Sequence, residues 1–258
     1  MEVVKRRERH GDRNLQFVFK REGFPPSLWG IPNTDESATV TLRKMKFQAA
    51  FAGLLVALHT AAGVKVMPLG DSITGSPGCW RALLWQKLQQ NGLSSQVDFV
   101  GTLPGDGCGF AYDSQNEGHG GFLATNVAND GSLRGWLSAT NPDVVMMHFG
   151  TNDVWNNKSP ATITAAFSTL VDQMRANNPR MKILVAQILP MTPSNCGDCN
   201  SRVQALNAAI PSWAAGKSTS TSPITVVNQY NGFNTATDTG DGVHPNNNGN
   251  TKVRDTVQ

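Results

Sequence analysis

The sequence has little charge: 16% of its 258 residues are Asp, Glu, Lys or Arg, whereas 39% are hydrophobic. This composition supplies enough apolar material for one sizeable core and excludes a disordered chain. The net charge of +3 comes from residues 1–44, which hold nine basic and six acidic side chains, because the remainder holds 13 of each. With no basic excess in the rest of the chain, we expect no nucleic-acid partner.

The sequence also lacks an apolar run of the roughly 20 residues that a membrane-spanning helix needs. The run from Ala49 to Leu58 is preceded by Met45-Lys46 and followed by small residues up to Gly63. This order is typical of a secretory signal peptide, although an ordinary buried helix is the alternative. We therefore predict an unstructured extension or gene-model artefact at 1–44, a signal peptide at 45–62, and a secreted chain, not anchored in a membrane, from about 63.

Cysteine is scarce, and its four copies, Cys79, Cys108, Cys196 and Cys199, all follow the predicted signal peptide. An even number of cysteines in an exported chain favours disulfides. Of the three pairings, Cys79 with Cys108 and Cys196 with Cys199 is the most economical. A zinc site at Cys196 and Cys199 would lack a second pair of Cys or His ligands. A thioredoxin-like redox site is disfavoured because this pair does not follow the first predicted strand.

Short β-branched runs alternate with longer segments of helical period from residue 63 onward, which predicts a parallel sheet covered by helices on both faces. No repeat of 20 to 50 residues is visible, so we expect one α/β domain over 63–258, a three-layer αβα sandwich with a flavodoxin-like, five-stranded parallel sheet. The predicted strands are Val64 to Leu69, Gln96 to Val100, Asp143 to Phe149, Lys182 to Ile188 and Ile224 to Asn228.

Helices are predicted where apolar residues recur every three to four positions between cap signals. One is closed by Asn91-Gly92, and another is opened by Ser159-Pro160. The predicted helices begin at Trp80, span Phe122 to Leu137 with interruptions at Gly131 and Gly135, run from Pro160 to about Asn177, span Asn200 to Trp213, and start again at Asn250.

Polar clusters follow four of the five predicted strands. Parallel α/β sheets place their sites at the carboxyl ends of the strands. Ser72 follows the first strand, and Asp241 and His244 follow the last. A serine hydroxyl becomes nucleophilic when a histidine takes its proton and a carboxylate fixes that histidine. An oxyanion formed by such a serine needs donors, and the backbone N–H groups of Ser72 and Gly121 and the amide of Asn152 are available.

Four motifs in this order resemble the SGNH, or GDSL-type, hydrolases. They are Gly70-Asp71-Ser72, the second glycine of His119-Gly120-Gly121, Gly150-Thr151-Asn152-Asp153 and Asp241-Gly242-Val243-His244-Pro245. The segment from Val66 to Thr74 with Trp80-Arg81, and Glu117 to Phe122, resemble acetyl esterases and acetyl xylan esterases of carbohydrate esterase family 3. The resemblance implies an SGNH hydrolase fold, Ser72 as nucleophile, Asp241 and His244 as the rest of the triad, and Ser72, Gly121 and Asn152 as oxyanion donors.

Two positions depart from the commoner pattern: Ile73 stands where many GDSL enzymes have Leu, and Gly120 replaces Ser. Neither change removes a catalytic atom. Around the site, His119, Asp71 and Trp155 are candidates for the pocket, with a core role equally open for Trp155. His148 is expected to be packed in its strand, and Asp71 and Asp153 to organise loops by hydrogen bonds.

The resemblance implies an enzyme that deacetylates xylan or a related oligo- or polysaccharide. We expect it to be secreted, to be a monomer and to use no metal or organic cofactor. It allows a structural calcium ion, but no loop has a full EF-hand pattern. Two other functions are open: a lipase or thioesterase acting on longer acyl chains, and a catalytically silent carbohydrate-binding relative. Asn157-Lys158-Ser159 is a sequon for N-glycosylation, which Pro160 directly after it disfavours.

Overall fold

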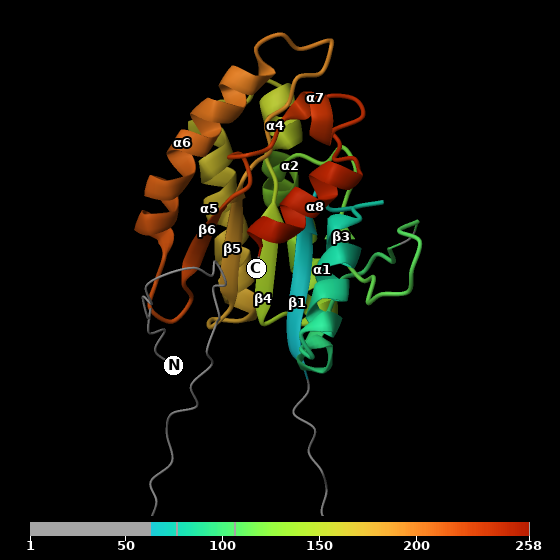
Figure 1. Ribbon diagram of the computed structural model, residues 1–258. Helices are drawn as coiled ribbons and strands as arrows, with labels where there is room; N and C mark the ends of the chain where they lie inside the picture. Colours follow the sequence, from blue (N-terminus) through green and yellow to red (C-terminus); the bar gives the residue numbers. More distant parts are fainter. Residues whose placement is uncertain (1–62, 76, 106, 258) are drawn as a thin grey trace, which may run out of the picture. The chain divides into compact units, whose positions relative to one another are not determined.

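A parallel sheet forms the middle layer of the protein in a computed structural model that describes residues 63–75, 77–105 and 107–257 (Figure 1). The strand order is β2-β1-β4-β5-β6, and β3 also pairs with β1. Apart from β3, this is the flavodoxin-like order expected from the sequence. The strands are β1 (Val64–Gly70), β2 (Val97–Phe99), β3 (Glu117–Gly118), β4 (Val144–His148), β5 (Lys182–Gln187) and β6 (Ile224–Asn228).

Each face of the sheet has its own hydrophobic core, because alternate strand residues point to opposite faces. In β4, Val145 and Met147 belong to the larger core, whereas Met146 belongs to the smaller one. The larger core includes side chains of α2, α3, α5 and α6, and the smaller one side chains of α1 and α8. These two helical layers around one sheet are the predicted three-layer αβα sandwich.

The helices follow local capping signals. Ser159 accepts a hydrogen bond from the backbone N–H of Thr162 and opens α5, with Pro160 at its first position. The helices are α1 (Trp80–Gln90), α2 (Ala124–Asp130), α3 (Ser132–Thr140), α4 (Thr151–Trp155), α5 (Pro160–Asn177), α6 (Cys199–Lys217), α7 (Thr235–Asp238) and α8 (Asn247–Thr256), and a 3₁₀ turn, η1, covers Ser94–Gln96.

The structure corrects several sequence predictions. Strand β3 was not expected, because two residues carry no periodicity. The Gly150-Thr151-Asn152-Asp153 segment is not a plain loop, since its last three residues open α4. Gly131, with φ of 73°, separates α2 from α3 as expected, but Gly135 lies inside α3 and interrupts nothing. Helix α8 begins three residues before the predicted start because Asn246 caps it.

The predicted extension at 1–44 and signal peptide at 45–62 lie outside the described residues. Both predicted disulfides are present, Cys79–Cys108 and Cys196–Cys199. In the part of the chain that the structure describes, no helix is long and apolar enough to cross a membrane.

Candidate active site

Ser72 lies two residues beyond β1, in a tight turn. The carbonyl oxygen of Asp71 accepts hydrogen bonds from the backbone N–H groups of Thr74 and Gly75, at 3.2 and 2.9 Å. The side chain of Asp71 accepts a further one from the N–H of Ile73, at 3.0 Å. The backbone on both sides of Ser72 is therefore fixed by the Asp71 residue itself.

His244 reaches this turn from the segment between α7 and α8. Its Nε2 lies 2.8 Å from Ser72 Oγ, although the two residues are 172 positions apart. Its Nδ1 lies 2.6 Å from Asp241 Oδ2. When Nδ1 carries the proton and donates to Asp241, Nε2 is free to accept the hydroxyl proton of Ser72. The three residues thus form one continuous chain of hydrogen bonds.

Asp241 remains ionised over the whole range in which such a site would work. Burial alone would raise its pKa, but hydrogen bonds from the His244 ring and from the backbone N–H groups of His244 and Val243 outweigh this and lower the pKa to about 2. The backbone bonds to Asp241 Oδ1 measure 2.7 and 2.9 Å. The carboxylate is therefore held as a fixed negative charge beside His244.

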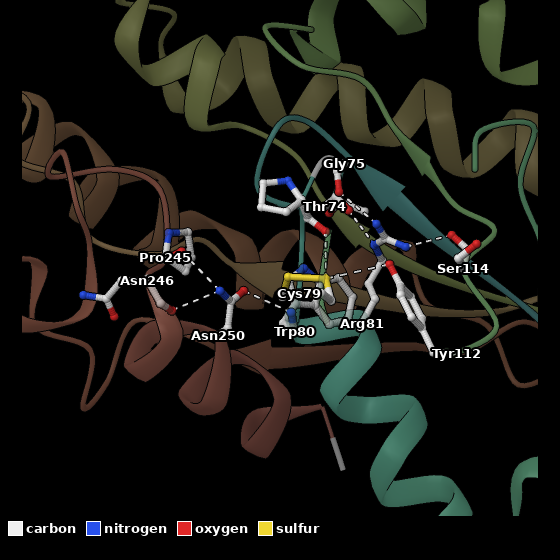
Figure 2. The surroundings of a disulfide bond; sticks show 12 residues. Thr74, Gly75, Cys79, Trp80, Arg81, Tyr112, Ser114, Pro245, Asn246 and Asn250 are labelled. Carbon is white, nitrogen blue, oxygen red and sulfur yellow. Dashed lines mark hydrogen bonds between the residues drawn. A yellow bond between two sulfur atoms is a disulfide. The ribbon is translucent and has the colours of Figure 1, made fainter. Parts of the chain in front are cut away.

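Asn250 of α8 ties the His244 segment to the start of α1 (Figure 2). Its side-chain oxygen accepts a hydrogen bond from the backbone N–H of Trp80 at 3.0 Å. Its amide donates to the carbonyl oxygens of Pro245 and Asn246, at 3.2 and 3.0 Å. One buried amide thus joins the residue after His244 to the helix that follows the Ser72 turn.

Arg81 of α1 fixes the other side of the turn, and Figure 2 shows its guanidinium between Thr74, Gly75 and Ser114. It is fully buried and donates to the carbonyl oxygens of these three residues, at 2.6, 2.8 and 2.9 Å. The neighbouring Cys79–Cys108 disulfide likewise joins the start of α1 to the loop that contains Ser114. Both features restrict the loop that carries Pro77 and Gly78, two residues that border a pocket next to Ser72.

Two of the predicted oxyanion donors, Gly121 and Asn152, each follow a residue that approaches the Ser72 turn, namely Gly120 and Thr151. A Cβ placed on Gly120 would come 3.9 Å from Ser72 Cβ, so this glycine lies close to the serine. Gly121 has φ of 79°, and Asn152 donates through Nδ2 to the carbonyl oxygen of Phe122 at 3.1 Å. Within the described residues, the backbone N–H groups of Ser72 and Gly121 donate no hydrogen bond.

Two aspartates organise the surrounding loops, as the sequence predicted. Asp153 accepts hydrogen bonds from the backbone N–H groups of Ala124 and Thr125 and from the Thr125 hydroxyl, and so joins α4 to the start of α2. Asp71 is fully buried, and burial raises its pKa to about 6 against the opposing effects of Ile73, Thr151 and the nearby His244.

Three further residues singled out from the sequence, His119, Trp155 and His148, are partly or fully buried. His119 is partly buried, and its Nε2 lies 2.6 Å from Glu117 Oε1. Trp155 is half-buried and packs against the larger core. His148 is buried in β4, as expected. The sequence predicts no role for Glu117 or Arg81, and for Asn250 only the start of a helix. Each has a partner on another segment, Thr102, Ser114 and Trp80 respectively, which sequence spacing does not reveal.

The described residues offer no evident set of ligands for a metal ion. Among residues 63–75, 77–105 and 107–257, no group of three or more His, Cys, Asp or Glu side chains is arranged to hold one. The residues around Ser72 therefore provide acid–base and hydrogen-bonding chemistry, and we assign no step to a calcium ion.

Comparisons with known proteins identify the family of this chain. The profile of the GDSL-like lipase/acylhydrolase family matches residues 69–252. A multidomain esterase of Ruminococcus flavefaciens is 30% identical over 220 residues, which cover 76% of this chain but only 28% of that protein.

Two solved structures are each 34% identical, with a TM-score of 0.69, and the match covers 75% of this chain and 94% of theirs. One is an acetyl esterase mutant with an acetate ion, and the other is a carbohydrate esterase family 3 protein from Talaromyces cellulolyticus. On the strength of the profile match and these similarities, the chain belongs to the GDSL-like lipase/acylhydrolase family of carboxylic ester hydrolases.

Proposed function

We propose that the protein is a serine esterase that removes acetyl groups from carbohydrates through an acyl-enzyme. The observation that carries this proposal is the chain of hydrogen bonds from Ser72 Oγ through His244 to Asp241, at 2.8 and 2.6 Å. A hydroxyl, an imidazole and a carboxylate in this order are the components that activate a serine for attack on an ester.

In the first step, Ser72 Oγ attacks the acetyl carbonyl carbon while His244 Nε2 takes the hydroxyl proton. The tetrahedral intermediate collapses when His244 returns this proton to the leaving sugar oxygen, which leaves an acetyl group on Ser72. Water then attacks the acetyl-enzyme by the same route, and acetate leaves. Asp241 stays ionised throughout and stabilises the imidazolium that forms in both steps.

The negative oxygen of each intermediate needs donors that are already in place. We assign this role to the backbone N–H groups of Ser72 and Gly121 and to the amide of Asn152. Gly121 suits it because, without a Cβ, a substrate oxygen can approach the main chain closely. Losing one donor of this kind typically lowers kcat about 10²- to 10³-fold.

Two observations favour an acetylated carbohydrate as the substrate. The side chains of His244 and Asp241 are 49% and 55% exposed, which suits a substrate that approaches from solvent, such as an acetylated oligo- or polysaccharide. The 34% identical relatives are an acetyl esterase with an acetate ion and a carbohydrate esterase. Xylan is our candidate polymer among acetylated plant polysaccharides.

We further propose that the enzyme is secreted and works as a monomer without a metal or organic cofactor. The two disulfides favour an oxidising compartment such as the extracellular space. No cofactor is needed because each proton transfer in the mechanism runs between Ser72, His244, the sugar oxygen and water.

Hydrolysis of p-nitrophenyl esters from acetate to octanoate, and acetate release from acetylated xylan, test the proposal. We expect acetate to be the best ester and Ser72→Ala to lower kcat by at least about 10³-fold. Ser212→Ala, an exposed serine of α6, is the matched control and should retain full activity. A preference for octanoate would refute the acetyl proposal, and a wild type no faster than Ser72→Ala would refute the serine esterase.

A further inference from the structure

A buried hydrogen-bonded pair beside the Ser72 turn has no part in the mechanism above. Glu117 of β3 is fully buried, and its carboxylate accepts hydrogen bonds from the backbone N–H and the hydroxyl of Thr102, both at 2.8 Å. His119 Nε2 lies 2.6 Å from the same carboxylate. A buried carboxylate with three hydrogen-bond partners is held in one position, so it determines where the His119 ring lies.

The His119 ring is also held on both faces. It stacks on Trp136 of α3 with ring centroids 4.2 Å apart and 14° between the planes, and on Phe122 at 4.8 Å and 23°. Its backbone N–H donates to the carbonyl oxygen of Gly70, the last residue of β1, at 2.8 Å. The residue is thus fixed at its edge, at both ring faces and at its backbone.

The two residues between His119 and Phe122 are both glycines, Gly120 and Gly121, and a Cβ on Gly120 would come 3.9 Å from Ser72 Cβ. A glycine pair has the greatest backbone freedom of any dipeptide, so its N–H groups need external anchors to keep one direction. The stack of Phe122 on His119 provides an anchor directly after the pair. The carbonyl oxygen of Phe122 accepts the hydrogen bond that orients the Asn152 amide, so the same anchor reaches two proposed oxyanion donors.

We propose that His119 is a positioning residue: held by Glu117 and stacked between Phe122 and Trp136, it fixes the Gly121 N–H and the Asn152 amide toward the oxyanion. This inference rests on the proposed esterase function. A positioning residue of this kind acts in the transition state, where charge develops on the oxygen, and much less in substrate binding. Its loss therefore lowers kcat while KM changes little.

The test is steady-state hydrolysis of p-nitrophenyl acetate by three variants, with thermal unfolding measured on each. His119→Ala removes both the hydrogen bond and the stack, and we expect kcat to fall about 10- to 100-fold with KM within about 3-fold. His119→Gln retains an N–H donor near the place of Nε2 but not the ring that stacks, so its kcat should lie between those of His119→Ala and the wild type. A His119→Gln enzyme no faster than His119→Ala would overturn the proposal.

Phe122→Ala keeps the proposal testable if His119→Ala does not fold, because the Phe122 side chain is exposed. Its matched control is Phe110→Ala, since the two rings are 40% and 37% exposed. We expect Phe122→Ala to lower kcat at least about 5-fold at an unchanged Tm, and Phe110→Ala to retain wild-type kcat. Equal kcat in the two variants would refute positioning by the stack. A wild type no faster than Ser72→Ala would refute the esterase itself and this inference with it.

Discussion

Gly242 shows how one residue sets the geometry of the Asp241–His244 segment. Its φ is 82°, in the left-handed region that glycine adopts without strain. A Cβ at this position would lie 2.5 Å from the carbonyl oxygen of Thr192, which is backbone and cannot move aside easily. The Gly242 carbonyl oxygen also accepts a hydrogen bond from the Thr192 N–H at 2.8 Å. Only glycine allows this approach of two main chains.

We therefore expect Gly242→Ala to displace Asp241 relative to His244. A displacement of about 1 Å in a catalytic group can lower the rate about 10²-fold, so kcat for p-nitrophenyl acetate should fall about 10- to 100-fold. Gly240→Ala is the matched control, because a Cβ on Gly240 meets no atom within 4 Å. Similar kcat values for the two variants would show that the close approach to Thr192 does not matter for catalysis.

Residues of the site could be predicted when local spacing carries the information. Asp241 and His244 are three positions apart and Ser72 comes two residues after a strand, so the rule that sites lie at the carboxyl ends of parallel strands predicts that they meet at one edge of the sheet. The geometry of Glu117 could not be read in this way. Its partner Thr102 lies on a separate segment, and neither residue type indicates that the carboxylate is buried.

Strong local signals predicted the bounds of α5, β1, β4, β5 and β6 within one residue, whereas α6 runs four residues beyond its predicted end and elements made by tertiary pairing were not predicted. Helix α5 begins at Pro160 and ends at Asn177, as its cap and periodicity indicate. Strand β3 exists because Glu117 and Gly118 pair with Leu69 and Gly70 of β1. Gly135 has open space around its missing Cβ and lies within α3, so a glycine ends a helix only where the backbone adopts a positive φ, as at Gly131.

The two disulfides connect elements over very different lengths of chain, and their contributions to stability should differ accordingly. Cys79 and Cys108 are 29 positions apart, and Cys196 and Cys199 only three. Loop-closure entropy in the unfolded chain predicts about 4 kcal/mol of stabilisation for the first and about 2 for the second. Urea unfolding of the Cys79→Ser/Cys108→Ser and Cys196→Ser/Cys199→Ser variants measures this difference directly.

Catalysis provides a second readout for the same variants. The Cys79–Cys108 bond restrains the segment with Pro77 and Gly78 beside Ser72, so its loss should also lower kcat several-fold. The Cys196–Cys199 variant is the control, since that bond lies at the start of α6. A larger loss of stability or activity in the Cys196→Ser/Cys199→Ser variant would contradict this assignment.

On the scale of the whole molecule, the pH dependence of stability reflects two buried groups that act in opposite directions. His148 is buried at the end of β4, and its ring nitrogens have no hydrogen-bond partner among the described residues. Burial lowers its pKa from 6.5 to about 4. The unfolded chain then binds more protons between these values, so His148 lowers the free energy of unfolding as the pH falls from 6.5 to 4.

Asp71 does the reverse, because burial raises its pKa from 3.8 to about 6. The folded protein binds more protons between these values, so the stability that protonated Asp71 contributes is fully present below pH 3.8 and is lost as the pH rises through 6. Each shift corresponds to roughly 3 kcal/mol. Between pH 7 and pH 4.5, the two contributions therefore nearly offset each other in the wild type.

Single substitutions should separate these contributions in urea unfolding at pH 7 and pH 4.5. Asp71→Asn retains only the His148 effect. Its free energy of unfolding should therefore fall by about 2 to 3 kcal/mol from pH 7 to pH 4.5, whereas that of the wild type should change little. His148→Leu retains only the Asp71 effect and should gain about 2 kcal/mol over the same change of pH.

The double variant Asp71→Asn/His148→Leu closes the cycle. With both groups removed, the difference between pH 7 and pH 4.5 should return to within about 1 kcal/mol of the wild-type difference, because the two contributions have opposite signs and neither residue is among the causes of the other's pKa shift. Asp241 does not disturb this window, since its pKa of about 2 keeps it ionised at both pH values. Parallel pH dependence in all four proteins would mean that neither buried group controls the stability of the fold.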